Sequence, residues 1–168
     1  MSLFLVDCEA PYGQTSPIQG PMTECGLVLF DRPPFLERFH WPLAGGIREL
    51  REWVLKKSVG KPVFVSDNPA YDWQWVAAEF ARAGLENPFG HSGRRISDFW
   101  AGLNRDLRRT QDWKRLRRTP HDHNPVNDSL GNAEALWTIL EGIKHGRPLD
   151  CLSWCSCTST HTCEGHRA

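Results

Sequence analysis

The chain has 168 residues, and its 20 Lys and Arg balance its 20 Asp and Glu. Hydrophobic residues make up 40% and charged residues 24%, which excludes bulk disorder and a strongly basic or polyacidic protein. The sequence contains no apolar run of the roughly 18 residues that a membrane span requires, and its first residues lack the positive region of a signal peptide. We therefore expect a cytoplasmic protein with reduced cysteines and one domain in residues 1–150.

The first third of the chain contains short apolar segments bounded by turn residues. Apolar runs predict strands at residues 3–9 and 26–31, and an alternating pattern predicts a third at 35–41. Residues 10–24 are rich in Pro and Gly and are expected to form a loop. The short connections favour an antiparallel meander.

The apolar period then changes to that of a helix, which begins at Ile47 and ends before Gly60. Residues 61–67 read as a buried strand and 71–83 as the next helix, with Trp73 and Val76 on its apolar stripe.

Three further elements follow. One more short strand is expected within residues 85–93, a basic helical region over 94–118 and a final helix over 128–145. The order predicts an α/β fold, with a mixed sheet of five to six strands (an antiparallel meander, then parallel strands) flanked by helices.

Acidic residues gather where these elements begin or end. Asp7 and Glu9 lie two apart on the first strand, so both carboxylates face the same side of the sheet. Asp67 and Asp72 flank the junction between a buried strand and a helix, where open sheets place their sites. A polar strand end and a helix N-cap are the alternative interpretations of these acids.

A third group precedes the last helix. His123 lies in a loop and Asp128 lies five residues later, with Pro125 between them. An imidazole beside an acid is typical of a general base next to a metal ligand, and a solvated loop histidine is the alternative.

In this order the three groups resemble the motifs of the DEDDh family of 3′–5′ exonucleases, which have a ribonuclease-H-like fold. The matching segments are Asp7-Cys-Glu9, Asn68-Pro-Ala-Tyr-Asp72 and His123-x4-Asp128, within a resemblance that covers residues 3–143. The small size and the Ala-Tyr-Asp sequence look most like the short mycobacterial-type exoribonucleases.

The resemblance implies that two Mg²⁺ or Mn²⁺ ions are held by four carboxylates, those of Asp7, Glu9, Asp72 and Asp128. Carboxylate oxygens suit these hard cations. It also implies that His123 is the general base of an exoribonuclease that releases nucleoside 5′-monophosphates from single-stranded RNA. Asp72 is preferred to Asp67 because the family pairs an aromatic residue with the acid. His123 is preferred to His121 because only His123 has the family spacing.

Residues 94–118 contain nine Lys or Arg against three Asp, an excess suited to a phosphate backbone. A solvated helix face is the alternative. Aromatic side chains off the apolar stripes could stack on unpaired bases, and for Trp75 a place in the core or an interface is the alternative. The predicted substrate-binding residues are Tyr12, Trp75, Arg94, Arg95, Arg105 and Arg108.

Other functions compete with this interpretation: an exonuclease on single-stranded DNA, or a catalytically silent nucleic-acid-binding module. Relatives of this fold often form dimers, so a homodimer is considered too. Residues 151–168 form a tail with four cysteines and two histidines, whose spacing differs from the common Cys-x2-Cys zinc patterns. Free thiols are expected there, and an interaction protein with a zinc-binding tail is the alternative.

Overall fold

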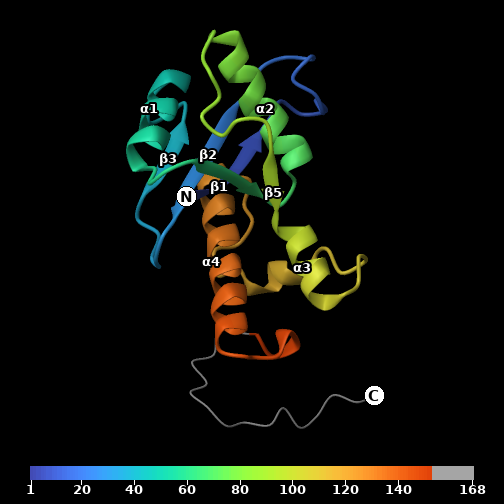
Figure 1. Ribbon diagram of the computed structural model, residues 1–168. Helices are drawn as coiled ribbons and strands as arrows, with labels where there is room; N and C mark the ends of the chain where they lie inside the picture. Colours follow the sequence, from blue (N-terminus) through green and yellow to red (C-terminus); the bar gives the residue numbers. More distant parts are fainter. Residues whose placement is uncertain (153–168) are drawn as a thin grey trace.

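Five strands form one mixed sheet at the centre of the computed structural model, which describes residues 1–152 (Figure 1). In chain order the strands are β1 (Ser2–Glu9), β2 (Glu24–Phe30), β3 (Arg38–Trp41), β4 (Pro62–Ser66) and β5 (Gly93–Arg95). Across the sheet the order is β3-β2-β1-β4-β5. β2 is antiparallel to β1 and β3, whereas β4 is parallel to β1 and β5. The predicted mixed sheet is confirmed, with five strands.

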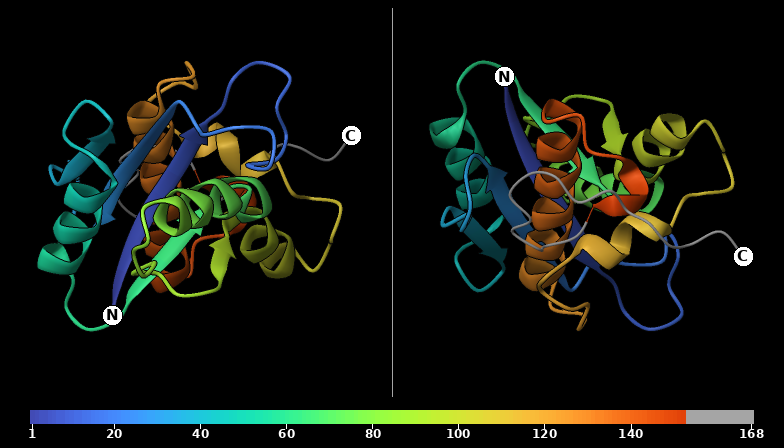
Figure 2. Two further views of the ribbon diagram at one scale, coloured as in Figure 1. Left: turned by 90° about the horizontal axis from the view of Figure 1, so that it is seen from above. Right: turned by 90° about the horizontal axis from the view of Figure 1, so that it is seen from below.

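Helices cover both faces of this sheet. They are α1 (Ile47–Lys57), α2 (Pro69–Arg82), α3 (Ile96–Asn104) and α4 (Pro125–Lys144), with short 3-10 helices η1 (Asp112–Leu116) and η2 (Leu149–Cys151). The views along the sheet show α1 and α2 over one face and α3 and α4 over the other (Figure 2).

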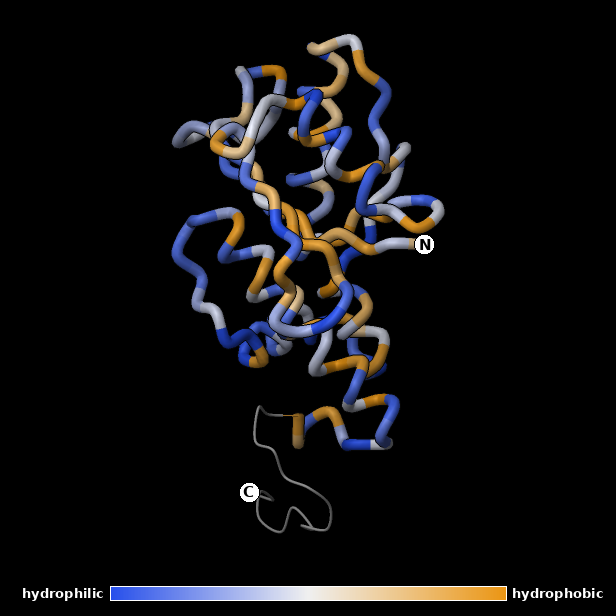
Figure 3. Tube along the Cα trace, turned by 90° about the vertical axis from the view of Figure 1, so that its left-hand side faces the viewer, coloured by the Kyte–Doolittle hydropathy of each residue, from blue (hydrophilic) through white to orange (hydrophobic). Residues whose placement is uncertain are grey.

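The alternation along β1 divides the core into two layers. Phe4 and Val6 pack with α1 and α2, while Leu5 packs with α3 and α4. The apolar stretches of the chain accordingly meet at the sheet, and polar stretches lie in the outer loops (Figure 3). By the same alternation Asp7 and Glu9 follow on the α4 side, at the end of the central strand.

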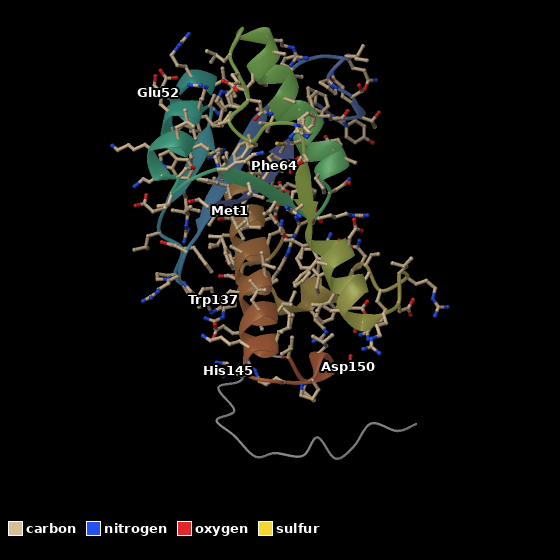
Figure 4. All side chains as sticks on the ribbon, viewed as in Figure 1. Met1, Glu52, Phe64, Trp137, His145 and Asp150 are labelled. Atoms are coloured by element: carbon tan, nitrogen blue, oxygen red, sulfur yellow. The ribbon has the colours of Figure 1, made fainter. Side chains whose placement is uncertain are left out.

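Helix α4 packs across the α3 side of the sheet. Its Trp137 lies against Phe30 and Phe35, with ring centroids 6.0 Å apart in each pair (Figure 4). Large aromatic pairs of this kind contribute much of the apolar area buried in a core. They fix the position of the middle of α4 on the sheet.

The start of α4 rests directly on the backbone of β2 at Gly26, which pairs with Asp7. A Cβ atom at Gly26 would lie only 2.1 Å from the carbonyl carbon of Pro125. Ser129 Oγ donates a hydrogen bond of 2.9 Å to the Gly26 carbonyl. Glycine is required here because of this close approach, which brings Asp128 in the first turn of α4 beside β1.

Several predicted elements differ from the structure. The short strand expected within residues 85–93 lies at Gly93–Arg95, and α4 begins at Pro125 instead of residue 128. The third strand begins at Arg38 and not at residue 35, because Phe35 has a φ of 51° and turns into the core. Residues 94–118 are not one helical region. They contain β5, α3 and η1, and α3 ends at Arg105, whose backbone is left-handed.

The prediction that Trp75 stacks on a base is wrong. Helix α2 begins at Pro69, and its buried face consists of Asp72, Trp75, Val76 and Phe80. Trp75 is fully buried, while Trp73 is only partly buried. The buried face of α2 is therefore rotated from the predicted one, and it carries both an acid and one of the three fully buried tryptophans of the described chain.

The zinc-binding alternative concerns the tail of residues 151–168. All of this tail except Cys151 and Leu152 lies outside the described residues. Within residues 1–152, no helix combines the length and the apolar character needed to cross a bilayer.

Candidate active site

Carboxylates from four elements meet at one edge of the sheet. β1 and β4 are parallel and end at the same edge, and this places Asp7 and Glu9 next to Asp67. Asp72 in the first turn of α2 faces the same cleft, which has a volume of about 290 Å³. Asp128 in the first turn of α4 is fully buried beside them.

These acids form two groups that share Asp7. Carboxylate oxygens of Asp7, Glu9 and Asp128 lie within 4.8 Å of one another, and so do those of Asp7, Asp67 and Asp72. The four predicted metal ligands are therefore brought together, and Asp67 joins them as a fifth acid. Two clusters with a common carboxylate can hold two neighbouring cations.

The crowding changes the acidity of the site. Burial, together with the charges of neighbouring carboxylates, raises the pKa of Asp7 well above its usual value. Burial, with a further contribution from Asp67, raises the pKa of Asp72 to about 8. Burial also raises the pKa of Glu9, although the nearby His123 lowers it. The carboxylates thus repel one another unless positive charge is placed among them.

The unused acceptor atoms fit divalent cations. Asp72 Oδ1 accepts a 3.2 Å hydrogen bond from the backbone N–H of Cys8, but Asp72 Oδ2 is buried without a partner among residues 1–152. Asp128 Oδ2 is likewise buried with no hydrogen bond from the described chain. Buried acceptors are normally satisfied. An all-oxygen set of this kind suits Mg²⁺ or Mn²⁺.

Two histidines approach the acids from the loop before α4. His121 Nδ1 lies 2.7 Å from Asp128 Oδ1, and His123 Nδ1 lies 3.6 Å from Glu9 Oε1. Their rings contact edge to face, with centroids 4.5 Å apart. The predicted base His123 is the more exposed of the two, at 77% of its side chain against 53% for His121.

The loop that presents these histidines is held by its own polar residues. Asn124 caps α4 by accepting hydrogen bonds from the N–H groups of Val126 and Asn127. Asp122 accepts hydrogen bonds from the Asn124 N–H and the Asn127 side chain. His123 has a left-handed φ of 61°. Asp122 therefore organises the loop and does not line the cleft.

Two basic side chains from η1 reach the acids as well. Lys114 Nζ lies 2.7 Å from Asp67 Oδ2. Arg117 Nη1 lies 3.8 Å from Asp128 Oδ1, and another Arg117 nitrogen donates to Asn132. Arg117 is only 8% exposed and its guanidinium packs over the Trp113 ring.

Comparisons with known proteins agree with this architecture. No family model and no curated protein matches the sequence. Among solved structures, the chain is similar to the nuclease domain of 3′hExo, a DEDDh family member, bound to rAMP. The TM-score is 0.60 over 86% of this chain and 92% of that one, at 11% sequence identity. The chain has a ribonuclease-H-like fold. The fold predicted from the sequence is therefore confirmed.

On this ribonuclease-H-like fold, the remaining predicted substrate-binding residues lie outside the cleft lining. Tyr12 is fully exposed in the loop after β1. Arg94 lies on the edge strand β5, and Arg105 ends α3. Arg108 pairs with Asp106 and is 91% exposed. Arg95 comes nearest to the acids, since its Nε donates a 3.0 Å hydrogen bond to the Asp67 carbonyl.

The sequence patterns did not place Lys114, Arg117 and Tyr71 in the site, yet all three line the cleft. The spacing of Lys114 and Arg117 is a sequence signal that could have placed them together. In a 3-10 helix, side chains three residues apart lie on the same side. Trp113 and Leu116 are buried, so Lys114 and Arg117 form the next stripe round η1. The sequence could have shown this stripe only if η1 had been recognised as a 3-10 helix.

Proposed function

We propose that this protein is a divalent-metal-dependent 3′–5′ exonuclease that releases nucleoside 5′-monophosphates from single-stranded RNA. The observation that carries this proposal is the convergence of Asp7, Glu9, Asp72 and Asp128 around buried, unpartnered carboxylate oxygens. The likeness of the fold to a nuclease domain supports it.

Asp7, Glu9, Asp72 and Asp128 would hold two Mg²⁺ or Mn²⁺ ions. When bound, such a pair supplies Lewis-acid stabilisation of the charge that develops at phosphorus. The buried carboxylates Asp72 and Asp128 are fixed at the starts of α2 and α4, so the fold itself orients the ligands. Asp67, which is paired with Lys114, lies at the side of this set.

His123 serves as the general base in this proposal. Its imidazole accepts a proton from the attacking water, whose oxygen forms a bond to phosphorus while the 3′ oxygen of the preceding nucleotide leaves. Its exposure at the mouth of the cleft leaves room for a substrate, whereas His121 is already in contact with Asp128. His121 is the alternative base, favoured by that 2.7 Å contact.

The preference for RNA over DNA rests on a contact to the 2′-hydroxyl. The neighbour 3′hExo has rAMP bound, which supports a ribonucleotide product for this chain too. Tyr71 lines the cleft and is an aromatic surface for a terminal base. A silent binding module would not need all four carboxylates and an imidazole, so we favour the enzyme. The cytoplasmic location and the homodimer stay predictions.

The decisive experiment is digestion of a 5′-labelled single-stranded RNA, with the matching DNA beside it, in Mg²⁺ or Mn²⁺. We expect a ladder that shortens from the 3′ end with RNA, and none with Asp7→Ala. Asp7 belongs to both acid groups, so its loss removes a ligand from each. Activity that survives in Asp7→Ala, or no cleavage of either strand in either metal, would refute the proposal.

A further inference from the structure

The positive charge of residues 94–118 is not spread evenly over the surface. Some of its arginines are engaged away from the cleft: Arg109 pairs with Asp112 and Asp150, and Arg115 donates to the carbonyls of Leu149 and Leu152. Among the described side chains of this stretch, Lys114 and Arg117 are the two that line the cleft. These two differ in what they can still bind.

Arg117 is already committed to the protein. It is almost buried, it packs on Trp113, and it donates to Asn132. Lys114 keeps 39% of its side chain exposed. An ammonium group has three donors, and the ion pair with Asp67 uses one of them. Lys114 is therefore the cation in the cleft that can accept another anion.

The position of Lys114 is fixed from both ends. Its helix η1 is anchored by Trp113, which is fully buried and donates hydrogen bonds to Ser97 and to the Thr110 carbonyl. Its ammonium is held by Asp67, whose own backbone carbonyl accepts a hydrogen bond from Arg95. A lysine held at both its backbone and its tip loses less side-chain entropy when it binds a ligand.

The balance of charge in the cleft indicates what Lys114 could bind. Two divalent cations would balance four of the five carboxylates that gather here, and Asp67 is the fifth. A phosphate that enters the cleft therefore needs positive charge from the protein itself. Lys114 contacts Asp67 in one of the two acid groups, whereas His121 and His123 contact acids of the other group.

We propose that Lys114 binds a phosphate group of the nucleic-acid strand and that Asp67 is the positioning residue that holds its ammonium in the cleft. This inference rests on the proposed function, because it takes a single strand as the ligand. It assigns Asp67 to the lysine, which explains a carboxylate beyond the four expected at the metal ions.

The test is the salt dependence of binding. A fluorescein-labelled single-stranded oligoribonucleotide is titrated with the Ca²⁺-loaded full chain, so that the strand stays intact, over a series of NaCl concentrations. Each phosphate contact contributes about 0.7 to the slope of log affinity against log salt for single strands. We expect Lys114→Met to weaken binding roughly tenfold and to reduce the slope by about 0.7.

Two further variants separate this role from a structural ion pair. Lys114→Arg keeps the charge and is expected to retain the wild-type slope. Lys144→Met removes a lysine at the far end of α4, about 24 Å from Asp128 at 1.5 Å per residue, and is expected to change neither affinity nor slope. Asp67→Asn is expected to weaken binding while the slope stays as in wild type, because the charge of the lysine remains.

The outcomes separate the two proposals. A wild-type chain that does not bind RNA refutes the proposed function and this inference with it. A wild-type chain that binds, together with a Lys114→Met variant of unchanged slope, overturns the inference alone. A lower Tm of Lys114→Met without any change in slope has the same meaning, since it shows an ion pair that only stabilises the fold.

Discussion

The contact between Gly26 and the start of α4 makes a sharp prediction, because one methyl group is enough to disturb it. In Gly26→Ala the new Cβ would lie 2.1 Å from the Pro125 carbonyl carbon and 2.2 Å from its oxygen. Both are backbone atoms, so no side chain can rotate away. Ordinary contact begins at 3.4 Å, and the start of α4 must therefore retreat by about 1.3 Å.

That retreat affects stability and activity together. Overpacking costs about 1–3 kcal/mol, and loss of the Ser129–Gly26 hydrogen bond costs about 1 kcal/mol more. For a chain of this size the sum lowers Tm by roughly 4 to 16 °C. Asp128 follows Pro125 in the first turn and moves with it. A displacement on the order of 1 Å in a catalytic group reduces turnover by about a hundredfold.

The assay compares thermal unfolding with RNA digestion in Mn²⁺ for Gly26→Ala and a matched glycine variant. Gly102→Ala is the control, because Gly102 lies on the exposed side of α3 and no described atom is within 4 Å of its Cβ. The control should equal wild type or gain up to about 1 kcal/mol from helix propensity. A Gly26→Ala variant with wild-type Tm and turnover would refute the close-contact argument.

Three other predictions follow from the site and the core. Between about pH 4 and about pH 8 the folded state keeps a proton on Asp72 that the unfolded chain has released, so the contribution of this carboxyl to metal-free stability falls as pH rises. The Tm gained on adding Mn²⁺ should therefore be larger at about pH 8 than at about pH 6, and an equal gain would contradict the raised pKa. His123→Ala should lower kcat about 10²- to 10⁴-fold with Mn²⁺ affinity in calorimetry largely preserved; if only His121→Ala is slow, His121 is the base. Trp75→Ala should cost about 3–5 kcal/mol in urea unfolding, because the ring is fully buried. A stable variant that binds RNA weakly would instead support base stacking.

The strands of the first sheet half could be predicted because short apolar runs bounded by turn residues mark β1 and β2. The long last helix could be predicted because residues such as Leu136 and Ile139 repeat at helical spacing along α4. The region after β5 could not be predicted from period alone. A left-handed residue at Arg105 ends α3, and η1 has a period of three that a helical template does not match.

The places of the acids at the ends of elements drew attention to them, but their choice as one set came from the resemblance to the DEDDh exonucleases. The structure brings them together. Their cationic partners were not identified, because the sequence of a basic stretch does not show which of its lysines or arginines lies next to the acids. Only the packing of Trp113 decides that Lys114 faces Asp67. The inward position of Trp75 was missed because Trp73 was placed on the apolar stripe, whereas the buried face of α2 runs through Asp72 and Trp75.

The cluster joins residues from opposite ends of the chain, since Asp7 is on the first strand and Asp128 on the last long helix. During synthesis from the N-terminus, the first two-thirds of the chain would already contain Asp7, Glu9 and Asp72. It would not contain Asp128, the histidines or Lys114. In that shorter chain the carboxylates of Asp7, Glu9 and Asp72 would repel one another, and the first turn of α4 with Asp128 would be missing from the cluster. Under the proposed function, RNA cleavage would therefore begin only after α4 has packed on Gly26, late in folding.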